Sequence, residues 1–276
     1  MSSRGLRRRL RASVQTLVFL FVFSFSLAAG PARTQEAEAE KTSALDRVFL
    51  EYSAGLDYSR GDYGLDRNSS LIYLPLGVTA DYDYWRFSVL VPVLYANGVT
   101  GAQSFGGPPP PGSDTIVSDH NAGLGEVVTS GSYLFAPPGE GLPWVELTGQ
   151  ILWPTRTNEN LGTGDFGFTT QLDLFQQFGR ITPFARVGRN FYLVGSLRDR
   201  FYTSIGASVE IAEGTSGGIA YDWLGSTSPD LEDGHELVPY LSFKASEHWT
   251  FGPYGVIGLA QGSPDFGVGL SIRFRP

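Results

Sequence analysis

The chain has 276 residues, of which 13% are aromatic and 17% are charged, and it contains 35 glycines and no cysteine. This length fits one domain of moderate size, and the missing cysteines exclude a disulfide scaffold, a cysteine-based zinc site and a lipidated N-terminal cysteine. The formal net charge of −8 makes nucleic acid a poor partner, because an acidic surface is repelled by the phosphate backbone.

The first 32 residues read as a secretory signal peptide. Five arginines between Arg4 and Arg11 precede an apolar run from Leu17 to Leu27, and small residues follow up to Ala32. A membrane-anchoring helix is the alternative interpretation, but the run is short for one. Cleavage would leave 15 basic against 28 acidic residues, a mature net charge of −13. Residues 33–47 are then a charged, alanine-rich periplasmic lead-in.

From residue 48 onward, apolar and polar residues alternate with a period of two, which is typical of β-strands. The link after each even-numbered strand is short, and the links after odd-numbered strands are mostly longer. Short turns on one side and longer loops on the other are the pattern of an outer-membrane barrel. We expect twelve strands, at Val48–Tyr58, Ser70–Ala80, Trp85–Tyr95, Leu124–Phe135, Trp144–Trp153, Asp165–Phe178, Ile181–Tyr192, Phe201–Ile211, Gly217–Leu224, Glu236–Ala245, Trp249–Ala260 and Phe266–Phe274.

The last strand, Phe266–Phe274, shows the pattern most clearly. One face carries only Phe, Val, Leu and Ile, and the other carries Gly, Ser and Arg. In an outer-membrane barrel the first face meets lipid and the second faces the lumen. The predicted fold class is therefore all-β: a transmembrane antiparallel up-and-down β-barrel of about 12 strands at residues 48–276, after a cleaved signal peptide. A soluble β-sandwich, with the apolar faces packed on a second sheet, is the alternative.

An even strand number places both termini in the periplasm, with the barrel in the cell outer membrane and lipid around it. We expect the barrel-insertion machinery to recognise Phe266–Phe274, although Arg275 and Pro276 follow the terminal aromatic residue.

Two features fit the barrel less well. Five prolines lie inside expected strands, where each loses a hydrogen bond; they are Pro75, Pro92, Pro183, Pro239 and Pro253. The longest break, Ala96–Asn121, contains four consecutive prolines and cannot be a regular strand. It is either a surface loop or a lid folded over or into the lumen.

Several segments together resemble a known family, namely LDYSRGDYG, WRFSVLVPVLY, GLGEVVTSGSYLF, HELVPYLSF and SPDFGVGLSIRF. They resemble the outer-membrane barrels described as transporters or as meta-pathway phenol degradation proteins, over nearly the whole chain from about Leu50 to Phe274. The resemblance implies an outer-membrane β-barrel that helps small, often aromatic or hydrophobic, compounds to cross. It implies no catalytic or binding residues.

The predicted inward positions include charges of both signs. Clustered at one depth, they would form a selectivity constriction for small-molecule solutes. The alternative is that opposite charges pair across the lumen and have a structural role, since buried charges are normally paired. The candidate pore-lining residues are Glu51, Arg86, Glu146, Asp173, Arg186, Glu210, Asp222, Lys244 and Arg273.

Signals for catalysis and metal binding are weak. Outer-membrane lipid hydrolases use a Ser-His pair, and this chain has His120, His235 and His248 but no GxSxG context. The acidic segment 230–236 offers oxygen ligands for Ca²⁺ but lacks the spacing of an EF-hand loop. We therefore expect no cofactor, no bound metal and no enzymatic activity. The expected function is passive uptake or efflux of small solutes, and the alternative is a non-conducting barrel that serves as an adhesin, a structural component or a lipid-active enzyme.

Overall fold

The structure, a computed structural model, describes residues 48–62, 68–98, 118–137, 139, 141–158, 161, 166–193, 199–226 and 232–276. The predicted signal peptide and lead-in, residues 1–47, lie outside this range. The strands are β1 (Val48–Gly61), β2 (Ser69–Tyr82), β3 (Trp85–Gly98), β4 (Ser118–Leu124), β5 (Val128–Phe135), β6 (Trp144–Leu152), β7 (Gly167–Phe175), β8 (Ile181–Tyr192), β9 (Arg200–Ala212), β10 (Thr215–Leu224), β11 (Gly234–Lys244), β12 (Trp249–Gly258) and β13 (Phe266–Phe274).

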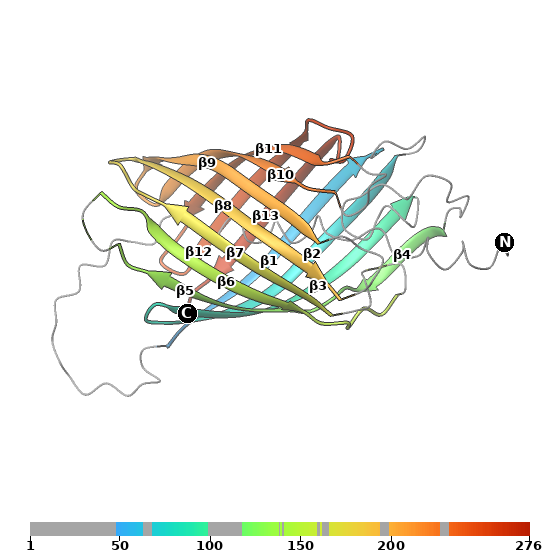
Figure 1. The fold of residues 1–276 in the computed structure, drawn as a ribbon, viewed down its shortest axis with the longest axis horizontal. Helices are drawn as coiled ribbons and strands as arrows, with labels where there is room; N and C mark the ends of the chain where they lie inside the picture. The colour runs from blue at the N-terminus through green and yellow to red at the C-terminus, as the bar shows by residue number, and fades with distance from the viewer. Residues whose placement is uncertain are drawn as a thin grey trace.

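These strands close into one antiparallel barrel (Figure 1). β1 pairs with both β13 and β2, β2 pairs with β3, and each later strand pairs with the next around the wall. β4 and β5 both pair with β3, along Val93–Gly98 and Trp85–Leu90 respectively, so together they occupy one position in the wall. The thirteen strands thus fill twelve positions, which confirms the predicted fold class. Among the described residues no helix is long and apolar enough to cross a membrane.

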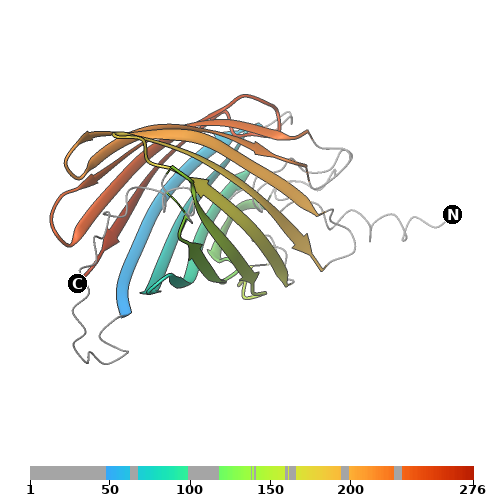
Figure 2. The same cartoon turned by 60° about the vertical axis from the view of Figure 1, so that its left-hand side comes forward.

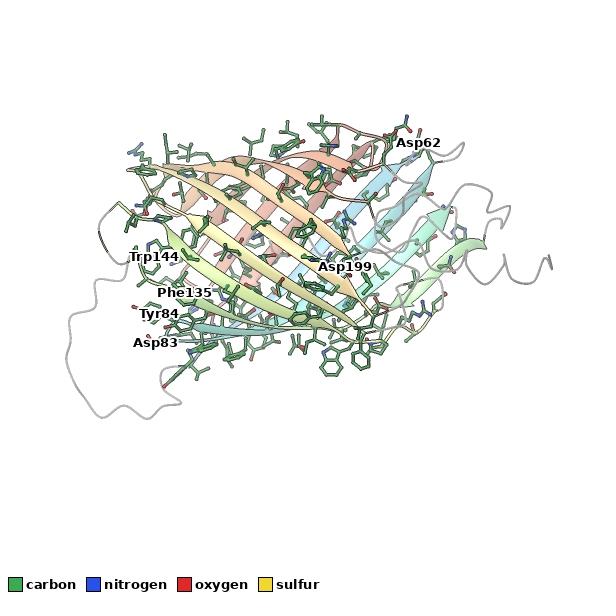
Figure 3. All side chains as sticks on the ribbon, viewed as in Figure 1. Asp62, Asp83, Tyr84, Phe135, Trp144 and Asp199 are labelled. Atoms are coloured by element: carbon green, nitrogen blue, oxygen red, sulfur yellow. The ribbon has the colours of Figure 1, made fainter. Side chains whose placement is uncertain are left out.

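All the strands slant strongly around the wall (Figure 2). The short turns gather at one rim, where Figure 3 labels Asp83, Tyr84, Phe135 and Trp144. We call this end the turn rim. The opposite end, where Asp62 and Asp199 lie, is the loop rim. Strand β1 begins and β13 ends at the turn rim, as the even strand number requires.

The outer surface of the barrel is apolar along every wall position. In β7 the large hydrophobic Phe168 and Leu174 are exposed, whereas Thr169, Gln171 and Asp173 on the other face are buried. A soluble protein would cover such side chains with a second layer, but here they are the outside of a closed barrel. The predicted assignment of the apolar face to lipid is therefore confirmed, and the sandwich alternative is wrong.

Aromatic side chains ring this apolar band at both rims, as interface girdles do. At the turn rim the ring of Trp85 lies 4.8 Å from that of Tyr133, and Trp249 lies 4.8 Å from Phe274. At the loop rim Trp153 lies 5.5 Å from Phe166. The apolar band between the two sets of aromatic rings is therefore the part of the wall assigned to the hydrocarbon layer.

The strand prolines lie where the ladders are interrupted. Pro75 of β2 faces Pro92 of β3 in the register, and the Pro92 carbonyl accepts the Gly125 N–H at 2.9 Å on the far side of β3. The nitrogen of Pro92 therefore points at the break between β4 and β5, and that of Pro75 points at β1, where pairing is interrupted at Gly55. Each proline thus directs its nitrogen toward a neighbour with which the ladder is already interrupted, which accounts for Pro75 in mid-strand.

The other three prolines follow the same rule. Pairing between β11 and β12 is interrupted at Pro239 and at Pro253, and pairing between β7 and β8 ends just before Pro183. A closed barrel thus accommodates proline by opening its ladder locally on one side of the strand.

The expected long break, Ala96–Asn121, is partly wrong. Residues 96–98 continue β3 and residues 118–121 begin β4, because Ala96 pairs with Asn121. Residues 99–117 lie outside the described part of the chain.

The expected strand Asp165–Phe178 is also too long: β7 ends at Phe175, and Phe178 forms only an isolated bridge with Ile181 across the tight Gly179-Arg180 turn.

An arginine placed on the lipid face is expected to be costly in mid-strand and tolerated near a rim. Ile205 lies in the middle of β9 with 63% of its side chain exposed, and Ile211 lies near the end of the same strand and face with 58% exposed. Ile205→Arg should lower the free energy of unfolding by about 2–4 kcal/mol, and Ile211→Arg by about 0–1 kcal/mol. Urea unfolding of the barrel in lipid vesicles measures both. Equal costs would contradict the assigned membrane band.

Candidate functional site

The inner wall is lined by side chains that the register places in oblique rows. Because strand partners lie side by side, residues linked through successive pairings follow a line across the wall, and strand tilt carries that line from one rim to the other. One such row crosses six strands from the turn rim to the loop rim through Glu146, Asp173, Arg186, Ser204, Asp222 and Glu236. A second row crosses eight strands through Glu51, Thr79, Ser88, Ser130, Gln150, Thr169, Asn190 and Arg200.

Hydrogen bonds tie neighbours within the second row. The Ser88 and Ser130 hydroxyls lie 2.6 Å apart, and the Thr169 hydroxyl donates to the Asn190 side-chain carbonyl at 2.8 Å. Such bonds satisfy polar side chains on the wall without closing the space between opposite walls.

At the turn rim the inward charges are balanced and paired. Arg86 donates to Asp81 at 2.7 Å, Arg275 donates to Glu51 at 2.7 Å, and Ser132 donates to Glu146 at 2.5 Å. Arg273 lies close enough to Glu51, Arg275 and Arg86 to interact with them electrostatically. The structure thus brings together Glu51, Arg86, Glu146 and Arg273 of the predicted set, and adds Asp81 and Arg275, which sequence reasoning missed because both lie at strand ends.

A buried ion pair lies midway along the first row. The Arg186 Nε donates to Asp173 Oδ1 at 2.5 Å, and both side chains are less than 5% exposed. Gln171 donates to the other carboxylate oxygen of Asp173 at 2.6 Å, and Tyr202 donates to Gln171 at 2.8 Å. Asp173 and Arg186 are therefore paired, but they join neighbouring strands of the wall and do not pair across the lumen as the alternative expected.

Toward the loop rim the first row ends in carboxylates. Asp222 and Glu236 face each other on β10 and β11, and Ser204 of β9 lies on the other side of Asp222. Glu236 also interacts electrostatically with Arg200 and Asp57. The Tyr254 hydroxyl donates to Asp57 in a short hydrogen bond. The predicted pore-lining set included Asp222 but not Asp57, Glu236 or Arg200. Alternation places Asp57 on the face of Glu51 and Glu236 on the face of Lys244, whereas Arg200 precedes the expected strand Phe201–Ile211.

The remaining predicted residues, Glu210 and Lys244, are exposed near the turn-rim ends of β9 and β11. The predicted set therefore divides into a balanced group at the turn rim, a buried group toward the loop rim and these two exposed residues.

Three inward tyrosines lie flat against the wall over glycines of the next strand. A Cβ built on Gly188, Gly218 or Gly269 would fall on the ring of Tyr202, Tyr240 or Tyr254 respectively. Two of the hydroxyls reach the strand beyond, at Gln171 and Asp57. Glycine is required because any side chain there would lift the ring into the lumen. Tyrosine and glycine alternate on the polar faces in the sequence, but only the register shows which pairs meet.

The lumen is unevenly filled. Inward residues toward the turn rim, such as Ser88 and Ser216, are half-exposed, so solvent reaches them. Toward the loop rim inward residues are buried. Two links fold against that end: Leu161 packs on Tyr73, Leu94 and Ala96, and Pro264 is fully buried where β12 leads into β13. The link after β6 also bonds to β4, where the Thr157 N–H donates to the Leu124 carbonyl at 3.1 Å.

The three histidines lie on the outer face or in a turn. His120 and His235 hydrogen-bond the hydroxyls of Tyr95 and Tyr221 at 2.8 and 2.6 Å, and His248 contacts the Arg275 carbonyl at 2.7 Å. These ring contacts involve no serine. Within the described ranges there is no group of three or more His, Cys, Asp or Glu side chains that could hold a metal ion; part of the acidic segment 230–236 lies outside those ranges.

Substitution of Gly269 is expected to narrow the lumen. An added Cβ meets only the flexible ring of Tyr254, so Gly269→Ala should turn this ring off the wall and break its bond to Asp57. We expect single-channel conductance to fall by roughly half, since the displaced ring enters the solvated path. Gly149→Ala, with open space around its Cβ, is the control. Unchanged conductance of Gly269→Ala would show that the ring does not border the path.

Comparison with solved structures finds the same fold in an outer membrane channel from Pseudomonas putida F1. The two chains are 13% identical, with a TM-score of 0.67, and the match covers 87% of this chain and 100% of that one. The KdgM porin and the CymD monoaromatic hydrocarbon channel match less well, at 10% identity and TM-scores of 0.47 and 0.44, over 82% of this chain and 98% and 88% of theirs. No family model and no curated protein matches the sequence. The fold and the apolar exterior are those of an outer-membrane barrel, as expected.

Proposed function

We propose that this protein is a passive outer-membrane channel for small solutes. The observation that carries the proposal is the polar lining: rows of charged, hydroxyl and amide side chains run from one rim to the other inside a closed wall whose outside is apolar. A polar lining of this kind is what a solvated path for solutes through a membrane barrel needs.

The lining indicates polar or charged solutes of small size. The two rows carry hydroxyl, amide and charged groups, and their members toward the turn rim, such as Thr79, Ser88 and Ser130, are half-exposed and would replace the hydration shell of a passing solute. The ring faces of Tyr240 and Tyr254, both half-exposed and paired in the register, offer a surface on which an aromatic compound would lie. The fold shared with a Pseudomonas putida outer membrane channel supports transport over catalysis.

The orientation we propose places the turn rim and both termini in the periplasm. Short turns lie on the periplasmic side of such barrels and longer loops on the outer side. The closing strand β13 would then present Phe274 to the insertion machinery from the periplasm. In this orientation the balanced ion pairs line the periplasmic mouth, and the buried acidic end faces outward.

A non-conducting barrel is the second candidate, and the packing at the loop rim favours it. Leu161 and Pro264 are fully buried at that end, together with the inward Leu94 and Leu224. If these side chains close the lumen completely, the barrel would act through its outer loops.

Planar bilayer recording decides between the two candidates. The channel proposal predicts stable single-channel steps from the purified protein and swelling of protein-containing liposomes in small sugars or amino acids. An inactivated preparation, with the barrel unfolded in urea before dilution, is the control. Neither steps nor swelling from a barrel that remains folded would contradict the proposal and leave the non-conducting candidate.

A further inference from the structure

The charges buried inside the barrel do not balance. Among the described residues, five carboxylates are at most 9% exposed, and only two guanidiniums are equally buried. The carboxylates are Asp57, Glu126, Asp173, Asp222 and Glu236, and the guanidiniums are Arg186 and Arg200. By contrast, the half-exposed acids of the turn rim, Glu51, Asp81 and Glu146, are balanced by Arg86, Arg273 and Arg275, of which Arg86 and Arg275 form ion pairs. The excess of negative charge therefore belongs to the loop-rim half of the lumen.

The ion pairs that exist leave the end of the first row uncompensated. Arg186 is bound to Asp173, at 2.5 Å, so this pair is neutral as a unit. Asp222 and Glu236 lie side by side on β10 and β11, and Asp57 adds a third carboxylate within electrostatic reach of Glu236. Arg200 is the one cation that faces Glu236 from within this group. Arg186 also interacts electrostatically with Asp222, but it already pairs with Asp173. Among the described residues, four acids (Asp57, Asp173, Asp222 and Glu236) therefore share two arginines, Arg186 and Arg200, which leaves a surplus of negative charge.

Polar atoms at this place lack partners. Oδ1 of Asp222 and Oε1 of Glu236 are buried and accept no hydrogen bond, and Nε of Arg200 donates none. Asp222 and Glu236 are 3% and 1% exposed. An unpaired carboxylate away from bulk water costs several kcal/mol, so each of these groups either takes up a proton or binds a cation that enters from solution. A partner that satisfies two carboxylates and reduces their repulsion is positively charged.

We infer that Asp222 and Glu236, with Asp57 close by, form a cation-binding constriction that makes the channel cation-selective. The inference rests on the proposed function, because it specifies the sign of the charge of the solutes that pass through the channel. Carboxylate groups around a pore select cations by attracting them and repelling anions.

Reversal potentials across a KCl gradient measure this selectivity directly. We expect the wild-type channel to pass K⁺ over Cl⁻ by about tenfold, which corresponds to ~1.4 kcal/mol. The double variant Asp222→Asn/Glu236→Gln should bring the ratio close to unity. Glu213→Gln, which removes one charge from the exposed turn between β9 and β10, should leave the ratio unchanged. Heat-dependent gel mobility checks that each barrel is folded, and the single variant Asp222→Asn serves if the double variant does not fold.

Binding is tested separately from conduction. Crystals of the wild-type protein grown with Tl⁺ should show an anomalous peak between the Asp222 and Glu236 carboxylates, and crystals of Glu236→Gln should lack it. Conduction without preference for K⁺, or with preference for Cl⁻, would overturn the inference and leave the channel proposal in place. Absence of conduction would contradict the channel proposal, and the Tl⁺ experiment alone would then test whether Asp222 and Glu236 bind a cation. Absence of a Tl⁺ peak at these carboxylates would show that they are not a cation-binding site.

Discussion

Replacing Arg186 by methionine is expected to lower the free energy of unfolding by about 3–5 kcal/mol, because it leaves the Asp173 carboxylate buried without its counter-charge. Both side chains of the pair are less than 5% exposed, and their atoms are 2.5 Å apart. Methionine is of similar length, so the loss reflects charge more than volume. Equilibrium unfolding in urea, followed by tryptophan fluorescence in vesicles, measures the change.

Two controls separate this effect from a general loss of packing. The double variant Asp173→Asn/Arg186→Met removes both charges and should recover most of the lost stability. Arg275→Met removes the ion pair with Glu51. Because the Arg275 side chain is 49% exposed, this change should lower the free energy of unfolding by no more than about 1 kcal/mol. If the double variant is as unstable as Arg186→Met, the charge of Asp173 is not the cause.

Valine at position 258 is expected to open the loop-rim mouth. A Cβ on Gly258 would overlap the backbone carbonyl oxygen of Pro264, so the link between β12 and β13 cannot keep its inward position. Pro264 is fully buried there, and Ser263 bonds the backbone of His235, so displacement uncovers the lumen end near Glu236. We expect single-channel conductance to increase on the order of twofold.

A glycine of the same strand provides the matched control. Gly255 has only ordinary contacts around its Cβ, at 3.8 Å, so Gly255→Val should leave conductance at the wild-type level. An unchanged conductance in Gly258→Val, with the barrel folded, would show that the link does not restrict the path.

The faces of the strands were predictable from the sequence because alternation is a local property. In β7 the order of Phe168, Thr169, Gln171, Asp173 and Leu174 alone indicates which side chains meet lipid, and the structure agrees. The tight turn at Gly179-Arg180 was also predictable from local sequence, because glycine readily adopts the positive φ that a two-residue hairpin turn requires. Gly179 has a φ of 61° in the structure.

Contacts between strands that no tight turn joins were not predictable, because they depend on the register of the closed barrel. Asp173 and Arg186 are different: the two-residue Gly179-Arg180 turn fixes the register of β7 and β8 and places them opposite each other, but the sequence analysis named them only as two lumen charges. The row from Glu146 to Glu236 appears only when six strands are aligned. The balanced turn rim and the acidic loop-rim end could not be told apart from composition.

Irregular segments were the other source of error. The break between β4 and β5 follows from Pro92, whose missing N–H interrupts the ladder at Gly125. The inward packing of Leu161 and Pro264 has no periodic signal at all, because both lie in links. A glycine such as Gly258, placed beside a strand end, is the one clue that a backbone segment approaches closely.

A nitroxide scan of β9 in lipid vesicles tests the central claim that the apolar faces lie in hydrocarbon around a solvated lumen. Because the chain has no cysteine, single-cysteine variants from Phe201 to Ile211 each report on one position. The account predicts a period-two alternation, with high collision rates with O₂ at Ile205 and Val209 and contact with a water-soluble nickel complex at Ser208. Protection of Ile205 and Val209 from both reagents would mean that protein covers this face, and would contradict the account.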